Sequence, residues 1–336
     1  MMTDADLSFS KKAHSLLIRY PRFTTLHNSI ELCREVSKIA GEAQCMSLEG
    51  STGAGKTTLI RDYAKAFHRR ETTEGTEIPV FYLETPSPVT VKGMAVTMLQ
   101  RLGDPAARKG TLTDMNDRLI NYLIHCHLQL IILDDFHHLI DSETDHVLQA
   151  VSDWLKVLIK ESGVPFLVVG IEHKVQRILE ANSQLSRLFP VREMLEPLQW
   201  LATDTKRTRE FAAFVNIMEK QIGLPLAPNV ARAELLTRLH YATDGVVGNL
   251  MNLIRFSTLS AVQQNVQHIE MAILAATFDK YLSKHLMDKV NPFDASWGAT
   301  FIAPNRTFYD RPEATGNRSR QRKKHVRTAN ELLKTS

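Results

Sequence analysis

The sequence predicts an α/β protein: a parallel sheet covered by helices on both faces, followed by a small all-helical domain. Three observations predict this. Short apolar runs of strand length alternate with helix-length amphipathic stretches up to about residue 197. A glycine-rich loop near residue 50 joins one apolar run to a helical pattern, and only helical stretches follow residue 197. Such alternation is typical of parallel sheets, because parallel strands need crossover connections that are usually helices.

Each expected element follows from its own stretch of sequence. Residues 1–40 are expected to form an N-terminal helical extension, 41–197 the α/β core, 198–287 the helical domain and 288–336 a basic tail. Expected strands cover 46–48, 79–84, 128–133, 165–170 and 191–195, and expected helices cover 57–67, 89–101, 112–127, 144–161 and 174–182. Four amphipathic stretches separated by Gly, Pro, Asn or Asp predict the helical domain.

The segment SLEGSTGAGKTTLI has the spacing G-x-x-x-x-G-K-S/T of a P-loop. Backbone N–H groups that converge at a helix N-terminus hold a triphosphate, and the loop needs glycine conformations. We therefore predict ATP as the cofactor. Its expected contacts are Gly50, Ser51, Thr52, Gly53, Ala54, Gly55, Lys56, Thr57 and Thr58. Lys56 would reach the β- and γ-phosphates, and the hydroxyl of Thr57 would bind Mg²⁺.

The second motif is LQLIILDDFHHLI, in which the apolar run 128–133 ends in Asp134 and Asp135. It predicts a Walker B strand, in which Asp134 holds Mg²⁺ through water and Asp135 polarises the attacking water. Asp135 has a second interpretation, as the N-cap of the following helix. Hydrolysing relatives more often carry glutamate here, and aspartate is one methylene shorter, so slow hydrolysis is expected. At least one other strand is expected between the two motif strands.

Composition excludes several classes of protein. The chain has 336 residues, 43% hydrophobic and 23% charged, enough for one large or two modest domains. It has no apolar run of about 18 residues and no signal-peptide core, so we expect a cytoplasmic protein without a membrane partner. Three widely spaced cysteines, Cys33, Cys45 and Cys126, are expected as buried apolar residues. The adjacent His137 and His138 are interpreted as structural.

The charge is concentrated at the C-terminus. Residues 306–336 hold nine basic residues against three acidic ones, with few apolar residues. A segment of this composition is expected to be disordered alone and suits a phosphate backbone or an acidic partner. The alternative is a solvated tail that only increases solubility.

A phosphate-binding α/β core followed by a helical lid is the layout of AAA+ ATPases. Within that class the chain resembles the TniB/TnsC family, the AAA+ regulators of Mu-like and CRISPR-associated cut-and-paste transposons. The resemblance covers about residues 10–293. It is carried by GSTGAGKTT, LIILDDFHHLI, ANSQLSRLF at 181–189 and NPF at 291–293.

The resemblance implies a mechanism. ATP binding would build a homo-oligomeric ring or filament around duplex DNA, a TniQ-type target selector would load it, and the transposase would be recruited to it. Arg187 lies where AAA+ rings place the arginine that reaches the γ-phosphate of a neighbouring subunit. Its alternative is a surface arginine on a helix-to-strand loop. Candidates for sequence-independent DNA contact are Lys92, Arg108 and Lys109, each of which is otherwise a solvated side chain.

One departure from AAA+ lids stands out in TDGVVGNLMNLIR. Many lids carry an arginine at the position of Gly248, whereas Arg255 follows two turns later and is a second candidate for that role. Two other functions stay open. A helicase-loader or initiator ATPase would read DNA with a domain after the lid, but only about 50 residues follow. A small-molecule kinase would turn over as a monomer and give Arg187 no role.

Overall fold

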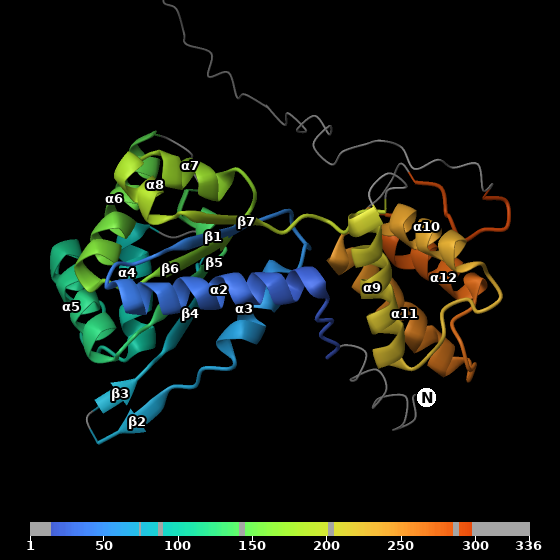
Figure 1. Cartoon of the computed structure of the whole chain (residues 1–336), viewed down its shortest axis with the longest axis horizontal. Coiled ribbons are helices and arrows are strands. Elements are labelled where there is room, and N and C mark those ends of the chain that lie inside the picture. The colour runs from blue at the N-terminus through green and yellow to red at the C-terminus, as the bar shows by residue number, and fades with distance from the viewer. Residues whose placement is uncertain are drawn as a thin grey trace, which may run out of the picture. The chain divides into compact units, whose positions relative to one another are not determined.

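Five parallel strands form the central sheet, in the order β4-β5-β6-β1-β7 (Figure 1). They are β1 (Met46–Glu49), β4 (Val80–Glu84), β5 (Leu130–Asp134), β6 (Phe166–Gly170) and β7 (Val191–Met194). The three middle strands β5, β6 and β1 are buried along their whole length, as expected when helices cover both faces. The predicted parallel sheet is confirmed, and β6 is the expected strand between β5 and β1.

The computed structural model describes residues 15–73, 75–86, 90–140, 145–200, 205–284 and 289–297. Most of the predicted basic tail, including 306–336, lies outside the described residues, as do the first 14 residues of the predicted N-terminal extension. The described part of the chain up to residue 297 belongs to a single compact unit.

Two hydrophobic clusters lie on opposite faces of the sheet, because successive side chains of a strand point to opposite sides. In β6, Leu167 and Val169 pack into the cluster formed with α2 (Pro21–Ala40) and α3 (Lys56–Ala64). Phe166 and Val168 of the same strand pack into the other cluster, which contains the helices α4 to α8. The strand residues thus divide between the faces with the period of two that a pleated strand imposes.

In the part of the chain that the structure describes, five helices cover the second face of the sheet, and side chains cap the start of several of them. They are α4 (Val91–Leu102), α5 (Leu112–His125), α6 (Asp145–Ser162), α7 (Lys174–Glu180) and α8 (Ser183–Leu188). Thr111 and Asp114 form a reciprocal capping box at the start of α5. Thr90 caps α4 by accepting a hydrogen bond from the amide of Gly93. These caps satisfy amides that the first turn of a helix leaves without partners.

A helical lid follows the sheet. It consists of α9 (Thr205–Ile222), α10 (Arg232–Thr243), α11 (Val247–Gln263) and α12 (Met271–Thr277), continued by the π-helical turn Phe278–Leu282. These match the four predicted stretches. Phe211, Phe214 and Leu250 of the lid belong to the same hydrophobic cluster as β1 and α2. Because this cluster is continuous, the predicted division between residues 197 and 198 stays a prediction.

The sequence patterns did not predict two features of the fold, a short hairpin and the helix α8. The hairpin of β2 (Arg70–Thr72) and β3 (Gly75–Glu77) has strands of three residues, too short and too polar to show a period. The predicted helix 174–182 corresponds to α7, and the short helix α8 that follows it was not predicted. Asn182 caps α8 by accepting hydrogen bonds from the amides of Gln184 and Leu185. Arg187 therefore lies in the last turn of α8 and not on the loop that the alternative interpretation gave it.

A segment after the lid, Lys289–Trp297, is clipped to α10. Nη1 of Arg238 donates hydrogen bonds to the carbonyl oxygens of Pro292 and Asp294, and its guanidinium stacks over Trp297 with 4.9 Å to the ring centroid. This clip contains the NPF segment.

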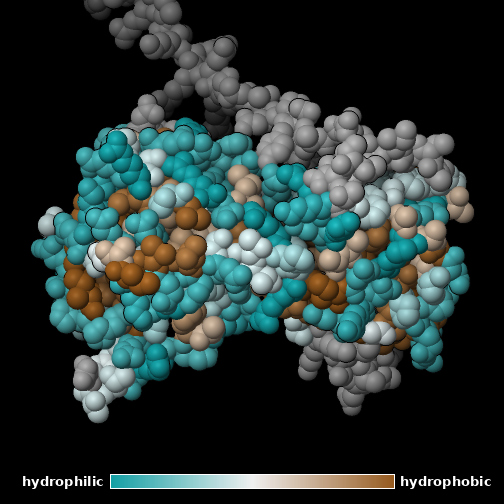
Figure 2. Space-filling model, viewed as in Figure 1, coloured by the Kyte–Doolittle hydropathy of each residue, from teal (hydrophilic) through white to brown (hydrophobic). Residues whose placement is uncertain are grey.

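The surface mixes hydrophilic and hydrophobic side chains (Figure 2). Leu32, Val36 and Ile39 of α2 are among the exposed large apolar residues. Among the described helices, none is long and apolar enough to cross a membrane.

Candidate nucleotide site

The P-loop joins β1 to α3 at the carboxyl edge of the sheet. Gly50, Gly53 and Gly55 have φ of 157°, 80° and 101°. A Cβ at Gly50 would lie 2.3 Å from the carbonyl oxygen of Leu195, so no side chain fits there. Gly55 in the left-handed conformation starts α3, whose first amides face outward as anion donors.

Lys56 is buried beneath this loop. Its Nζ donates hydrogen bonds to the carbonyl oxygens of Gly50 at 2.7 Å and Ser51 at 3.0 Å. Burial lowers the pKa of Lys56, while the charges of Asp135 and Asp134 oppose that shift. The ammonium group is thus held between the P-loop and the two carboxylates, where it can bind phosphate oxygens.

Asp134 ends β5 and is fully buried. Its carboxylate accepts hydrogen bonds from the hydroxyl of Thr57, from the amide of Asp135 at 3.0 Å and from the hydroxyl of Tyr82 at 3.1 Å. Burial raises the pKa of Asp134, and the hydrogen bond from Thr57 opposes this rise. An adjacent hydroxyl and carboxylate at a P-loop are oxygen ligands of the kind that Mg²⁺ takes, so the residues fit this ion.

Asp135 adopts φ of 49°, a conformation unusual for any residue but glycine. The turn ends β5, leads into the 3-10 helix Phe136–Ile140, and leaves Asp135 lining the cavity above the P-loop. Strained backbone of this kind is found at functional sites. Of the two interpretations of Asp135, the cavity position favours the one at the phosphates over the helix cap.

A chain of polar contacts runs from Asp134 to the surface. The hydroxyl of Tyr82 donates to Asp134 and accepts from Nε of Arg61 at 2.8 Å. Nη2 of Arg61 forms an ion pair with Glu84 at 2.6 Å. Arg61 and Glu84 are both about half exposed. The geometry of the buried carboxylate is therefore linked to an ion pair at the end of β4, the edge strand of the sheet.

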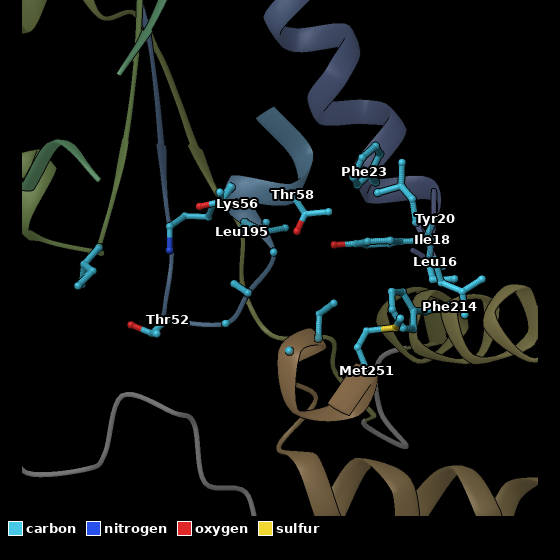
Figure 3. A pocket seen from close by; sticks show the side chains of 18 of the residues that line it. Leu16, Ile18, Tyr20, Phe23, Thr52, Lys56, Thr58, Leu195, Phe214 and Met251 are labelled. Carbon is cyan, nitrogen blue, oxygen red and sulfur yellow. The ribbon is translucent and has the colours of Figure 1, made fainter. Parts of the chain in front are cut away.

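The P-loop opens into a cavity of about 500 Å³. Its polar side consists of Gly53 to Thr58 with Asp135, His137 and Arg255. Its apolar wall comes from distant parts of the chain: Leu16, Leu17, Ile18, Tyr20, Phe23, Leu195, Phe214, Val247 and Met251. Figure 3 shows the ring of Tyr20 pointing toward Thr58, with Phe214 and Met251 of the lid beside it. Phosphates would fit the polar side and a nucleoside the apolar one.

Gly248 is the point where the lid meets the P-loop. Its amide donates a 2.8 Å hydrogen bond to the carbonyl oxygen of Gly53. A Cβ at Gly248 would lie 3.1 Å from that oxygen and 3.3 Å from the Cα of Gly53. The absence of an arginine here thus has a steric reason. Arg255 does line the cavity, and burial lowers its pKa.

Sequence reasoning missed His137 and the apolar wall. His137 was interpreted as structural, yet it lines the cavity and is only 8% exposed. Its position, two residues after the acidic pair of a Walker B strand, was the available signal. The wall carried no local signal, because it joins residues 16–23 to lid residues about 200 positions later.

The remaining candidates lie elsewhere. Arg187 is exposed, does not line the cavity, and makes no hydrogen bond or ion pair with any described residue. Lys92, Arg108 and Lys109 are exposed as well. The loop carrying Arg108 and Lys109 is held by Arg118, which donates to Asp104 at 2.9 Å and to the carbonyl oxygen of Lys109 at 2.8 Å.

A P-loop, an acidic strand end and a helical lid around one cavity define a P-loop ATPase with the AAA+ fold. Solved structures share this fold. Cdc6p from Pyrobaculum aerophilum is 13% identical with a TM-score of 0.58, covering 84% of this chain and 74% of that one. The Aeropyrum pernix ORC1 protein in complex with DNA is 13% identical with a TM-score of 0.55, covering 81% and 68%. The Aeropyrum pernix ORC2 protein is 16% identical with a TM-score of 0.54, covering 82% and 71%.

Residues 10–197, more than half of the chain, match the family described as Bacterial TniB protein. The chain therefore belongs to the TniB family, as the sequence motifs predicted. A comparison with curated proteins finds no match.

Proposed function

We propose that this ATPase assembles on duplex DNA as a homo-oligomeric ring or filament when it binds ATP, and that the assembly regulates transposition. In this proposal it links a TniQ-type target selector to the transposase, in the cytoplasm. The observation that supports the proposal is the position of Arg187, which is exposed and lies outside the cavity of its own chain, where a second copy of the chain can reach it.

Arg187 is an exposed arginine at the end of a short, firmly capped helix. Asn182 caps α8 and also donates a 2.7 Å hydrogen bond to Asp153 of α6, which holds the helix in place. A planar guanidinium binds phosphate oxygens bidentately. Because Arg187 lies outside its own cavity, the γ-phosphate that it suits belongs to a neighbouring copy. Assembly would then depend on ATP.

Within one subunit the roles follow from the geometry. Lys56 binds the β- and γ-phosphates, Thr57 and Asp134 hold Mg²⁺, and Asp135 polarises the attacking water. Bound Mg²⁺ supplies positive charge to the phosphates. The short side chain of Asp135 makes hydrolysis slow, which suits an ATPase that uses turnover to disassemble.

DNA contact is proposed for the exposed cations of α4 and the loop after it. Lys92 lies in the first turn of α4, and Arg108 and Lys109 lie in the loop that Arg118 holds. Contacts from such side chains to phosphates would be independent of sequence and sensitive to salt. The basic residues of 306–336 are a second proposed contact, to DNA or to the transposase.

The test is the mass of the particle formed with a short random-sequence duplex, measured by light scattering at physiological salt. We expect a large complex with a non-hydrolysable ATP analogue and none with ADP. A monomer in both states would contradict the proposal.

Mixing two inactive variants tests Arg187 directly. Arg187→Ala keeps its own nucleotide site, and Lys56→Ala keeps its arginine, so mixed assemblies contain complete sites. We expect ATPase activity to return on mixing, and Arg101→Ala, which changes another exposed arginine in the last turn of a helix, to remain active alone. Full activity of Arg187→Ala alone would remove the proposed role.

The likeness to ORC1 and Cdc6p favours one alternative, a helicase-loader or initiator ATPase acting on DNA. The two functions differ in their partners. Retention of a TniQ-type protein and a transposase by the ATP-bound DNA complex supports transposition, whereas retention of a replicative helicase alone supports the alternative.

A further inference from the structure

The strand between the two motif strands brings no polar side chain to the nucleotide site. β6 lies between β5 and β1, so its carboxyl end faces the place where the terminal phosphate of a bound nucleotide would lie. β5 ends in Asp134 and β1 leads into the P-loop, but β6 ends in Gly170. A Cβ at Gly170 would lie 2.6 Å from Cγ2 of Val175 and 3.2 Å from Nδ1 of His137. The space next to this strand end is thus taken by an imidazole from another element.

His137 comes from the 3-10 helix that follows β5. It is 8% exposed and lines the cavity together with Lys56 and Thr57. Its Nδ1 is buried and has no hydrogen-bond partner among the described residues. A buried polar atom without a partner is costly and is rare in folded proteins, so the contacts within the described chain do not account for the position of this ring.

Other buried polar atoms without partners gather at the same edge of the sheet. Oε2 of Glu49 lies at the end of β1, Oγ of Ser51 in the P-loop, and Oγ1 of Thr85 just after β4. None of these three residues lines the cavity, whereas His137 does. Among the buried polar atoms without a partner in the described residues, that of His137 is therefore the one that belongs to a cavity-lining side chain.

The charge state of His137 determines what the ring can offer to a ligand. Burial lowers its pKa, and the neighbouring His138, Lys174 and Lys56 act in the same direction, while Asp135 opposes them. The ring is therefore neutral at physiological pH and has one N–H donor. The ring of His138 contacts it in a tilted arrangement, with 4.4 Å between ring centroids and 36° between the ring planes.

We propose that the imidazole of His137 donates a hydrogen bond to the γ-phosphate of bound ATP, in place of the side chain that β6 lacks. His137 would then distinguish ATP from ADP, because only ATP has an oxygen at that position. The proposal depends on the ATPase site alone and not on assembly with DNA, so either can fail without the other.

The first test is equilibrium binding of a non-hydrolysable ATP analogue and of ADP to the full chain, without DNA. We expect His137→Ala to weaken binding of the ATP analogue about tenfold, as for the loss of one hydrogen bond to a charged group, and to change ADP binding less than twofold. His137→Gln, which keeps an N–H donor, should recover part of the loss. His146→Ala, at an exposed histidine of α6, should bind both nucleotides normally.

Equal losses for both nucleotides, or no loss for either, would overturn the proposal. A second measurement does not depend on the variants folding. In the wild-type chain with ¹⁵N-labelled histidine, the ¹⁵N chemical shifts of the His137 ring should differ between the complex with the ATP analogue and the complex with ADP. The same spectrum in both nucleotide states would contradict the proposal.

Discussion

The two sides of the nucleotide cavity are built in different ways. Most of the phosphate side comes from one continuous loop and the turn after one strand, Thr52 to Thr58 with Asp135 and His137. The apolar wall joins the N-terminal segment to the lid, as in the edge-to-face contact of Tyr20 and Phe214 with 5.3 Å between ring centroids. The first side is built mainly from residues that are close together in the sequence, with Arg255 added from the lid. The apolar wall is complete only while the lid packs against the N-terminal segment, so its structure depends on the position of the lid.

Lys56→Ala breaks the phosphate side and should have the largest effect. Loss of the buried ammonium removes the group proposed to bind the β- and γ-phosphates, and we expect ATP turnover to fall at least about 100-fold, as when one transition-state donor is lost. Steady-state ATPase rates measure this. Lys65→Ala, at the exposed C-cap of α3, is the matched control. Comparable rates in both variants would show that Lys56 does not contact phosphate.

Gly248→Val breaks the contact between the two sides. The added carbons collide with Gly53, and overpacking of this kind costs about 1–3 kcal/mol. Because the lid would be pushed off the P-loop, ATP and ADP should both bind about tenfold more weakly. Calorimetric titration measures both affinities. Asn252→Ala changes an exposed residue of the same helix and should bind normally; a Gly248→Val chain with wild-type affinities would mean that the contact is dispensable.

Tyr82→Phe sharpens the comparison within the phosphate side. It deletes the hydroxyl that orients Asp134 and costs about 1 kcal/mol, so about fivefold more Mg²⁺ should be needed for half-maximal binding of the ATP analogue. Tyr63→Phe, which deletes a hydroxyl that donates to Glu31 at 2.6 Å, is the control. An unchanged Mg²⁺ requirement would show that the hydroxyl of Tyr82 does not influence metal binding at Asp134.

A fall in pH should lower the stability of the folded chain through His240 of the lid. Burial lowers the pKa of His240 to about 4, while its Nε2 lies 3.1 Å from the carbonyl oxygen of Leu198. The unfolded chain, with a histidine pKa near 6.5, takes up a proton first as pH falls. The free energy of unfolding should therefore fall below pH 6.5 by about 1.4 kcal/mol per unit, until the folded pKa is reached.

Denaturant unfolding at pH 7 and pH 5.5 checks this effect. The loss of stability at pH 5.5 should be about 1 kcal/mol smaller in His240→Gln than in the wild-type chain. Equal losses would exclude His240 as the cause.

The sequence predicted what local spacing encodes. The P-loop, the acidic end of β5 and the parallel sheet follow from residues that are neighbours in the chain, and the structure confirms the sheet and brings the motifs together. The apolar wall was not predictable, because nothing in the local sequence around Phe23 or Met251 indicates that the two residues line the same cavity. Gly248 shows a third case: the sequence showed a missing arginine, but only the approach of α11 to Gly53 explains why a glycine lies there.

The clip between Arg238 and Trp297 has a mechanical consequence. A partner that pulls on the chain beyond residue 297 pulls on α10, because Arg238 and Lys289 fasten Lys289–Trp297 to that helix. From α10 the backbone passes through Asp244 and Gly245 into α11, whose first turn bonds to the P-loop. Tension on the C-terminal segment would thus be transmitted through α10 and α11 to the backbone of the P-loop.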